Sequence, residues 1–183
     1  MTQHEYIFVA VSMILGLAIT RLLHAVAMLI RAHRLVTFHW ATALWGLCIL
    51  AYTLQLWWIG WGLRSVALWT FLDFLVLVVG SICIYGAAEM ALPVPEAERD
   101  TLDFLQHSEK LGRLSALSML LYFAVGPYVN LTMLAEPVPL AAALTFPAVG
   151  ITLMLLIIVL PRFFPWFVSI FAGYTAIILY LTA

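Results

Sequence analysis

The chain has 183 residues, of which 66% are hydrophobic and 9% are charged. A soluble domain carries about 25% charged residues, so these few charges cannot give a folded chain of this length a hydrated surface. The net charge of −1 supplies no basic field for nucleic acid, which excludes that class of partner. We therefore expect a lipid bilayer around the chain and an all-α integral membrane protein.

Six apolar stretches are long enough to cross a bilayer, which takes about 20 residues in a helix. They predict a polytopic bundle with short loops in one transmembrane domain, 1–183. The first stretch has no basic residue before it, so we expect a permanent span rather than a cleaved signal. An alternative has five spans, with the last two stretches forming a bent hairpin that does not fully cross. The six predicted spans are 6–30, 38–62, 66–91, 114–134, 140–160 and 164–182.

The one substantial polar stretch is 93–113. Pro95 suits the first turn of a helix, and the acidic residues Glu96, Glu98 and Asp100 suit its positive end. We expect a cytoplasmic helical connector between the third and fourth spans.

Basic residues in the loops predict the orientation. The loops after the first, third and fifth spans hold six Lys and Arg residues, and the opposite side holds only Arg64. Because basic loops stay in the cytoplasm, both termini should be non-cytoplasmic in a bacterial-type inner (plasma) membrane. Tryptophans then mark the outer boundary at Trp57, Trp58, Trp61 and Trp69, and the inner boundary at Trp40 and Trp166.

Ionisable side chains inside a span are costly and therefore informative. Arg21 lies in the inner third of the first span, with His24 one helical turn further on. Arg21 either extends toward the cytoplasmic headgroups or is paired within the bundle along an ion or solute path. By depth, Glu89 or Tyr85 of the third span is a better partner for Arg21 than Asp73.

A second polar group is expected nearer the outer side. Asp73 and Gln55 have matching depths in the third and second spans, and Asn130 lies slightly shallower in the fourth. Together with Tyr128 they could line an outer vestibule that holds a cation or a proton. They could equally form a structural network between helices.

Two prolines lie inside predicted spans, Pro127 in the fourth and Pro147 in the fifth. Proline removes a backbone donor, so the freed carbonyl group needs another partner or lines a cavity. Each proline thus marks either a helix break at a binding site or a plain kink.

Signals for an enzyme are absent from the sequence. It contains no Walker-type glycine loop, no paired metal-ligand motif and no nucleophile elbow, so we expect no catalytic residue, metal or cofactor. His24 and His39 could ligate a haem, but their spacing does not require it. Cys48 and Cys83 lie deep in apolar runs and are expected to be buried and unpaired.

These features favour an ion channel or small-solute transporter that works as a homo-oligomer, because little of the chain lies outside the membrane. The alternative is a non-transporting membrane subunit, sensor or assembly factor for a partner protein, and a third candidate is a membrane enzyme or redox carrier that would need a bound haem or quinone. The subunit alternative predicts that the polar groups are fully satisfied within the bundle.

Overall fold

The computed structural model describes residues 2–33, 36–66, 68–94, 102–103, 111–133 and 139–182. Within these residues, six helices are long and apolar enough to cross a membrane, which confirms the predicted all-α bundle. The last two helices are each long and apolar enough to cross, which favours six spans over the five-span alternative. The helices are α1 (Gln3–Arg31), α2 (Trp40–Gly62), α3 (Phe71–Ala91), α5 (Gly112–Tyr128), α6 (Leu140–Val159) and α7 (Phe164–Thr182).

Local capping sets where two of the helices begin. Thr2 and Glu5 form a capping box at the start of α1, in which each side chain binds the backbone N–H of the other. Thr70 and Asp73 form the same motif at α3. The third span therefore begins as a helix at Phe71, whereas the sequence predicted a start at 66.

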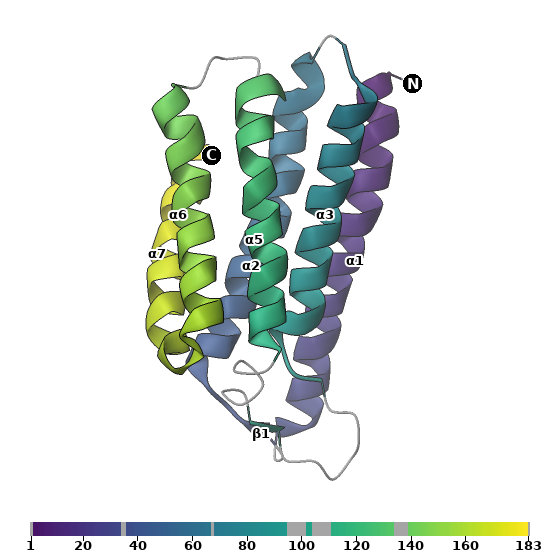
Figure 1. Cartoon of the computed structure of the whole chain (residues 1–183). Helices are drawn as coiled ribbons and strands as arrows, with labels where there is room; N and C mark the ends of the chain where they lie inside the picture. The colour runs from purple at the N-terminus through teal and green to yellow at the C-terminus, as the bar shows by residue number, and fades with distance from the viewer. Residues whose placement is uncertain are drawn as a thin grey trace.

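Short loops make sequence neighbours antiparallel, and both chain ends lie toward the same end of the bundle (Figure 1). In this view α2, α3 and α5 lie between α1 on one side and the α6–α7 pair on the other. The main packing partners are α3 with α1 and α5, α5 with α6, and α2 with α7. Two short 3-10 turns, η2 (Leu63–Ser65) and η4 (Pro161–Phe163), and the π-helical turn η3 (Val129–Met133) complete the described helical parts.

A small strand pair lies at the opposite end of the bundle from the termini. The strand β1 (Val36–Thr37) pairs in parallel with β2 (Leu102–Asp103). β-branched residues such as those of β1 favour extended backbone. At these two residues of β2 the structure differs from the helix predicted for the connector, while 95–101 and 104–110 lie outside the described residues.

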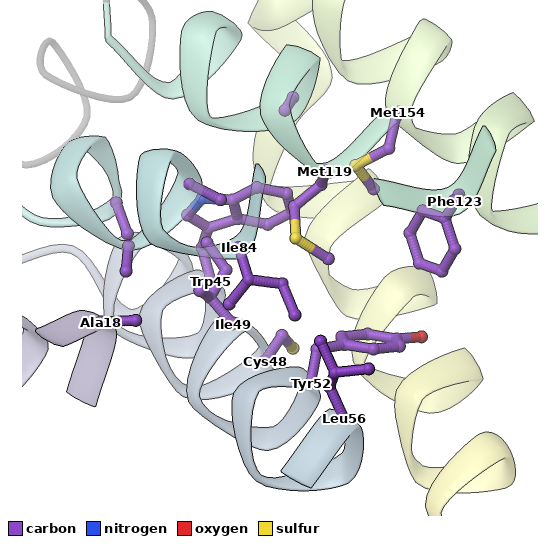
Figure 2. Close-up of a cluster of buried hydrophobic side chains, with 14 of the residues drawn as sticks. Ala18, Trp45, Cys48, Ile49, Tyr52, Leu56, Ile84, Met119, Phe123 and Met154 are labelled. Carbon is purple, nitrogen blue, oxygen red and sulfur yellow. The ribbon is translucent and has the colours of Figure 1, made fainter. Parts of the chain in front are cut away.

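The buried core is centred on Trp45 (Figure 2). The indole Nε1 of Trp45 donates to Ser115 Oγ at 2.9 Å, and that hydroxyl donates to the carbonyl oxygen of Ala87 at 2.8 Å. These two hydrogen bonds join α2, α5 and α3, and they pair polar atoms of residues that are fully buried. Cys48 and Cys83 are buried and free, as the sequence predicted.

The outside of the bundle is apolar, unlike the surface of a soluble protein. Leu68 is 84% exposed and Trp166 is 73% exposed, and large apolar side chains of every spanning helix are likewise exposed. Trp57, Trp58 and Trp61 are exposed together at the end of α2, in the position predicted for an aromatic belt. Lipid is the solvent that such a surface requires.

Candidate functional site

Arg21 and Glu89 form an ion pair between α1 and α3. Arg21 Nη2 lies 2.8 Å from Glu89 Oε1, so the pairing favoured by depth is confirmed. Both side chains are about one-third exposed, at 31% and 38%, on the outside of the bundle. His24 is exposed on α1 and takes no part in the pair, although the sequence placed it on the same face, and Tyr85 is half-buried against the core. This site neutralises a charge in the membrane but encloses no path.

Asp73 is buried in a local network at the start of α3. Its Oδ2 accepts hydrogen bonds from the backbone N–H and the hydroxyl of Thr70, both at 2.8 Å, and its Oδ1 accepts from the Tyr128 hydroxyl at 2.8 Å. A carboxylate in the first turn also suits the positive end of the helix. The sequence analysis missed Thr70, although the Thr-x-x-Asp pattern before an apolar run is the signal for such a cap.

Gln55 and Asn130 belong to a different site from Asp73. Gln55 Nε2 donates to Thr182 Oγ1 at 3.3 Å, which joins α2 to the end of α7. Asn130 Nδ2 donates to the carbonyl oxygen of Ala143 at 3.3 Å. Both residues line one cavity, whereas Asp73 is not among its lining residues. The predicted outer cluster is therefore divided in two.

The Asn130 bond explains how α6 continues through Pro147. Pro147 has no N–H to bond the carbonyl of Ala143, four residues earlier, and the Asn130 side chain supplies the missing donor. Pro127 also lies within its helix, and the π-helical turn η3 follows it. Neither proline ends its helix, but Pro147 and the neighbouring Gly126 line the cavity.

The cavity lies between α2, α3, α5, α6 and α7, in the half of the bundle nearer the termini. Its volume is about 350 Å³, at the small end of the range of about 300–1,000 Å³ for ligand sites. The described residues that line it include no Asp, Glu, Lys, Arg or His. Its walls are mainly aliphatic and aromatic, so it suits a small neutral molecule rather than an ion.

Tyr52 is the most unusual residue of the cavity wall. Its side chain is 2% exposed, and its hydroxyl has no hydrogen-bond partner among the described residues. The ring is held by Phe171, stacked at 5.6 Å between centroids, and by Phe123, edge-on at 5.3 Å. Figure 2 shows Tyr52 extending from α2 with its hydroxyl oxygen at the far end, beneath Phe123. The sequence analysis did not identify Tyr52, because a tyrosine in an apolar run gives no signal of its own.

A second apolar groove differs from the cavity because its described residues hold no unpaired buried polar group. A groove of about 470 Å³ lies between α1 and α2, lined mostly by aliphatic side chains between Leu22 and Leu50. His33 lines this groove, but its Nδ1 is already within hydrogen-bond distance of the carbonyl of Ile30, at 3.1 Å. Among the described residues of this groove, no buried polar atom lacks a partner. Nothing there selects one apolar molecule over another.

The described residues contain no cluster of three or more His, Cys, Asp or Glu side chains that could hold a metal ion. His39, considered above as a haem ligand, instead caps α2 by accepting from the backbone N–H of Ala41 at 3.3 Å. Comparisons of the chain with protein-family models, curated proteins and solved structures give no match. The features that bear on function are therefore the cavity and the polar groups around it.

Proposed function

We propose that the chain is a small-solute transporter of the membrane, and that the cavity between α2, α3, α5, α6 and α7 is its solute site. The observation that carries the proposal is a neutral, mostly apolar space of about 350 Å³ within the bundle. Gly126 and Pro147 meet at its wall, and irregular helix segments that line a cavity are typical of transporter sites.

A solute fits the site better than an ion does. Ion paths use carbonyl or charged groups that replace the hydration shell of the ion. Here Arg21 and Glu89 bind each other, and Asp73 is occupied by Thr70 and Tyr128. In liposomes containing the purified protein, we expect potassium flux equal to that of protein-free liposomes. A flux that Asp73→Asn abolishes would contradict the proposal and favour an ion channel.

Occupation of the cavity can be tested with durene, an apolar methylated benzene. We expect labelled durene to bind saturably to nanodiscs that contain the protein, above the level of protein-free nanodiscs. A Cβ on Gly80 would lie 3.9 Å from Tyr122 Cδ2 and from Val125 Cγ1, so Gly80→Leu should fit the backbone and fill the cavity. Loss of saturable binding in this variant is the expected result.

The matched control is Gly16→Leu on α1, a helix that does not line the cavity. A Cβ on Gly16 meets no atom within 4 Å, so the same substitution adds a side chain that faces lipid. This variant should bind durene like the unchanged protein. Equal durene binding by Gly80→Leu and Gly16→Leu would overturn the proposed solute site.

We further propose that the transporter is a homo-oligomer in a bacterial-type inner membrane, with both termini outside the cytoplasm. The basic loop residues support this orientation, which places the cavity in the outer half of the bilayer. A reporter that is active only in the cytoplasm, fused after Ala183, should give no signal. Single-molecule photobleaching of the labelled C-terminus should give more than one step per particle.

A second candidate function is a non-transporting subunit, sensor or assembly factor. It is favoured by one observation: Arg21, Gln55, Asp73 and Asn130 all bind groups within the same bundle. Purification in a mild detergent distinguishes the two candidates. A partner protein recovered in fixed ratio, together with no saturable durene binding, would favour the subunit over the transporter.

A further inference from the structure

The cavity contains an unused hydrogen-bond donor, the hydroxyl of Tyr52. Two other hydroxyl groups at the cavity are already engaged: Tyr174 donates to the carbonyl of Phe146 at 2.6 Å, and Thr182 donates to the carbonyl of Ile178 at 2.8 Å. Tyr52 is 2% exposed and has no such partner among the described residues. Because buried hydroxyl groups are normally paired, this one indicates a group that enters the cavity.

The position of the Tyr52 hydroxyl is fixed before any molecule binds. Phe171 stacks on the Tyr52 ring with 18° between the planes, and Phe123 and Tyr122 meet it edge-on at 87° and 68°. These ring contacts hold the hydroxyl oxygen in place, and the hydroxyl groups of Thr175 and Tyr174 lie near it without meeting hydrogen-bond geometry. Preorganised donors of this kind add selectivity, because little freedom is lost when the ligand binds.

The residues that line the cavity indicate which class of ligand carries the acceptor for the Tyr52 hydroxyl. Phe123, Phe146, Tyr122 and Tyr174 line the cavity with Tyr52, and aromatic rings pack favourably on other flat rings. The described lining residues include no ionisable acid or base other than tyrosine, so a charged ligand would lack a counter-charge. A phenol hydroxyl donates well to a carbonyl oxygen.

We propose that the cavity binds a neutral aromatic carbonyl compound of the quinone class, with the Tyr52 hydroxyl donating to a carbonyl oxygen of the ring. This inference rests on the proposed function, which makes the cavity the solute site, and adds the chemical class of the solute. The Tyr52 hydroxyl then selects between ligands of equal shape, because an apolar analogue would leave this hydroxyl unpaired.

A comparison of duroquinone with durene tests the proposed contact with the Tyr52 hydroxyl. Both compounds have a tetramethylated six-membered ring, and only duroquinone has the two carbonyl oxygens. Binding of each labelled compound is measured on nanodiscs with the full chain and corrected for uptake by protein-free nanodiscs. We expect duroquinone to bind roughly 3- to 10-fold more tightly than durene, the effect of one net hydrogen bond. Durohydroquinone, which offers hydroxyl groups in place of the carbonyls, should bind more weakly than duroquinone.

Tyr52→Phe keeps the ring and removes the hydroxyl, so it should abolish the preference for duroquinone and leave durene binding unchanged. Tyr180→Phe is the matched control, since Tyr180 is 84% exposed and does not line the cavity. This control should keep the full preference. A preference that survives in Tyr52→Phe, or that Tyr122→Phe removes instead, would overturn the assignment of Tyr52.

The results also separate this inference from the proposed function. If Gly80→Leu abolishes binding of both compounds while the unchanged protein binds them equally, the solute site stands and the quinone class is wrong. If neither compound binds saturably to the unchanged protein, the proposed solute site fails as well. Tighter binding of durohydroquinone than duroquinone would show that Tyr52 accepts rather than donates, which also overturns the inference.

Discussion

The same three helices, α2, α3 and α5, enclose a close-packed core around Trp45 in one half of the bundle and line a cavity in the other. In the Trp45 half, near the strand pair, small residues allow the helices to approach, and Trp45 fills the remaining space. The cavity half, near the termini, has the large aromatic residues Tyr52, Tyr122 and Phe123 in the cavity wall. The buried small residues of the Trp45 half include Ala41, Ala87, Ala88, Ser115 and Ala116.

The hydrogen bonding of buried polar atoms also differs between the two halves. The indole of Trp45 donates to Ser115, and Ser115 donates to the carbonyl of Ala87, so these two buried donors of the Trp45 half are used within the protein. In the cavity half the hydroxyl of Tyr52 remains unpaired. Close packing around a hydrogen-bonded Trp45 indicates a structural role, and open space with an unpaired hydroxyl indicates a binding role.

Removing the centre of the Trp45 half should have the largest effect. Trp45→Ala is expected to lower the free energy of unfolding by about 3–5 kcal/mol, because it leaves a large void and removes the hydrogen bond from the indole to Ser115. Reversible unfolding in mixed detergent micelles measures this change. Trp166→Ala is the control, since Trp166 is 73% exposed on the outside of the bundle. Equal loss in both variants would contradict a central role for Trp45.

The same glycine substitution should have opposite effects at two positions. A Cβ on Gly150 would lie 2.7 Å from the ring of Phe123, whereas a Cβ on Gly80 has ordinary contacts at 3.9 Å. Gly150→Ala should therefore cost about 1–3 kcal/mol through overpacking. Gly80→Ala should stabilise its helix by roughly 0.5–1 kcal/mol, since alanine favours a helix over glycine. Equal free energies of unfolding for Gly150→Ala and Gly80→Ala would show that the helices rearrange and close the cavity.

The ion pair on the outside of the bundle should have a smaller effect. Arg21→Gln is expected to lower the free energy of unfolding by about 1 kcal/mol, because the pair is partly exposed and polar contacts between membrane helices are individually weak. A double-mutant cycle with Glu89→Gln isolates the pairwise contribution. Strictly additive losses would mean that the two side chains do not stabilise each other.

The smallest effect is expected from Tyr52→Phe on stability. Because the Tyr52 hydroxyl lacks a partner, its removal should leave the free energy of unfolding of the ligand-free protein unchanged or slightly higher. Tyr174→Phe makes the contrast, since the Tyr174 hydroxyl binds the carbonyl of Phe146 and its loss should destabilise by about 1 kcal/mol. A larger loss for Tyr52→Phe would assign its hydroxyl a structural partner.

The depth of a residue along its helix predicted some contacts between helices and missed others. Depth alone was sufficient for Arg21 and Glu89, because ionisable groups at one level of a membrane have few alternatives to pairing. It was insufficient for Asp73, because the cap at Thr70 moved the start of α3 and placed the carboxylate in the first turn. Asn130 and Pro147 lie on different helices, so their link through the Ala143 carbonyl could not be found from spacing.

The amino-acid sequence by itself determined that the chain forms six helices long and apolar enough to cross a bilayer, because length and hydropathy are properties of each segment alone. The tertiary structure decided which faces of those helices meet. Helices that are apolar all around give no periodic signal for their rotation, and only packing sets it. The cavity, the engaged polar groups and the unpaired Tyr52 hydroxyl all depend on that rotation.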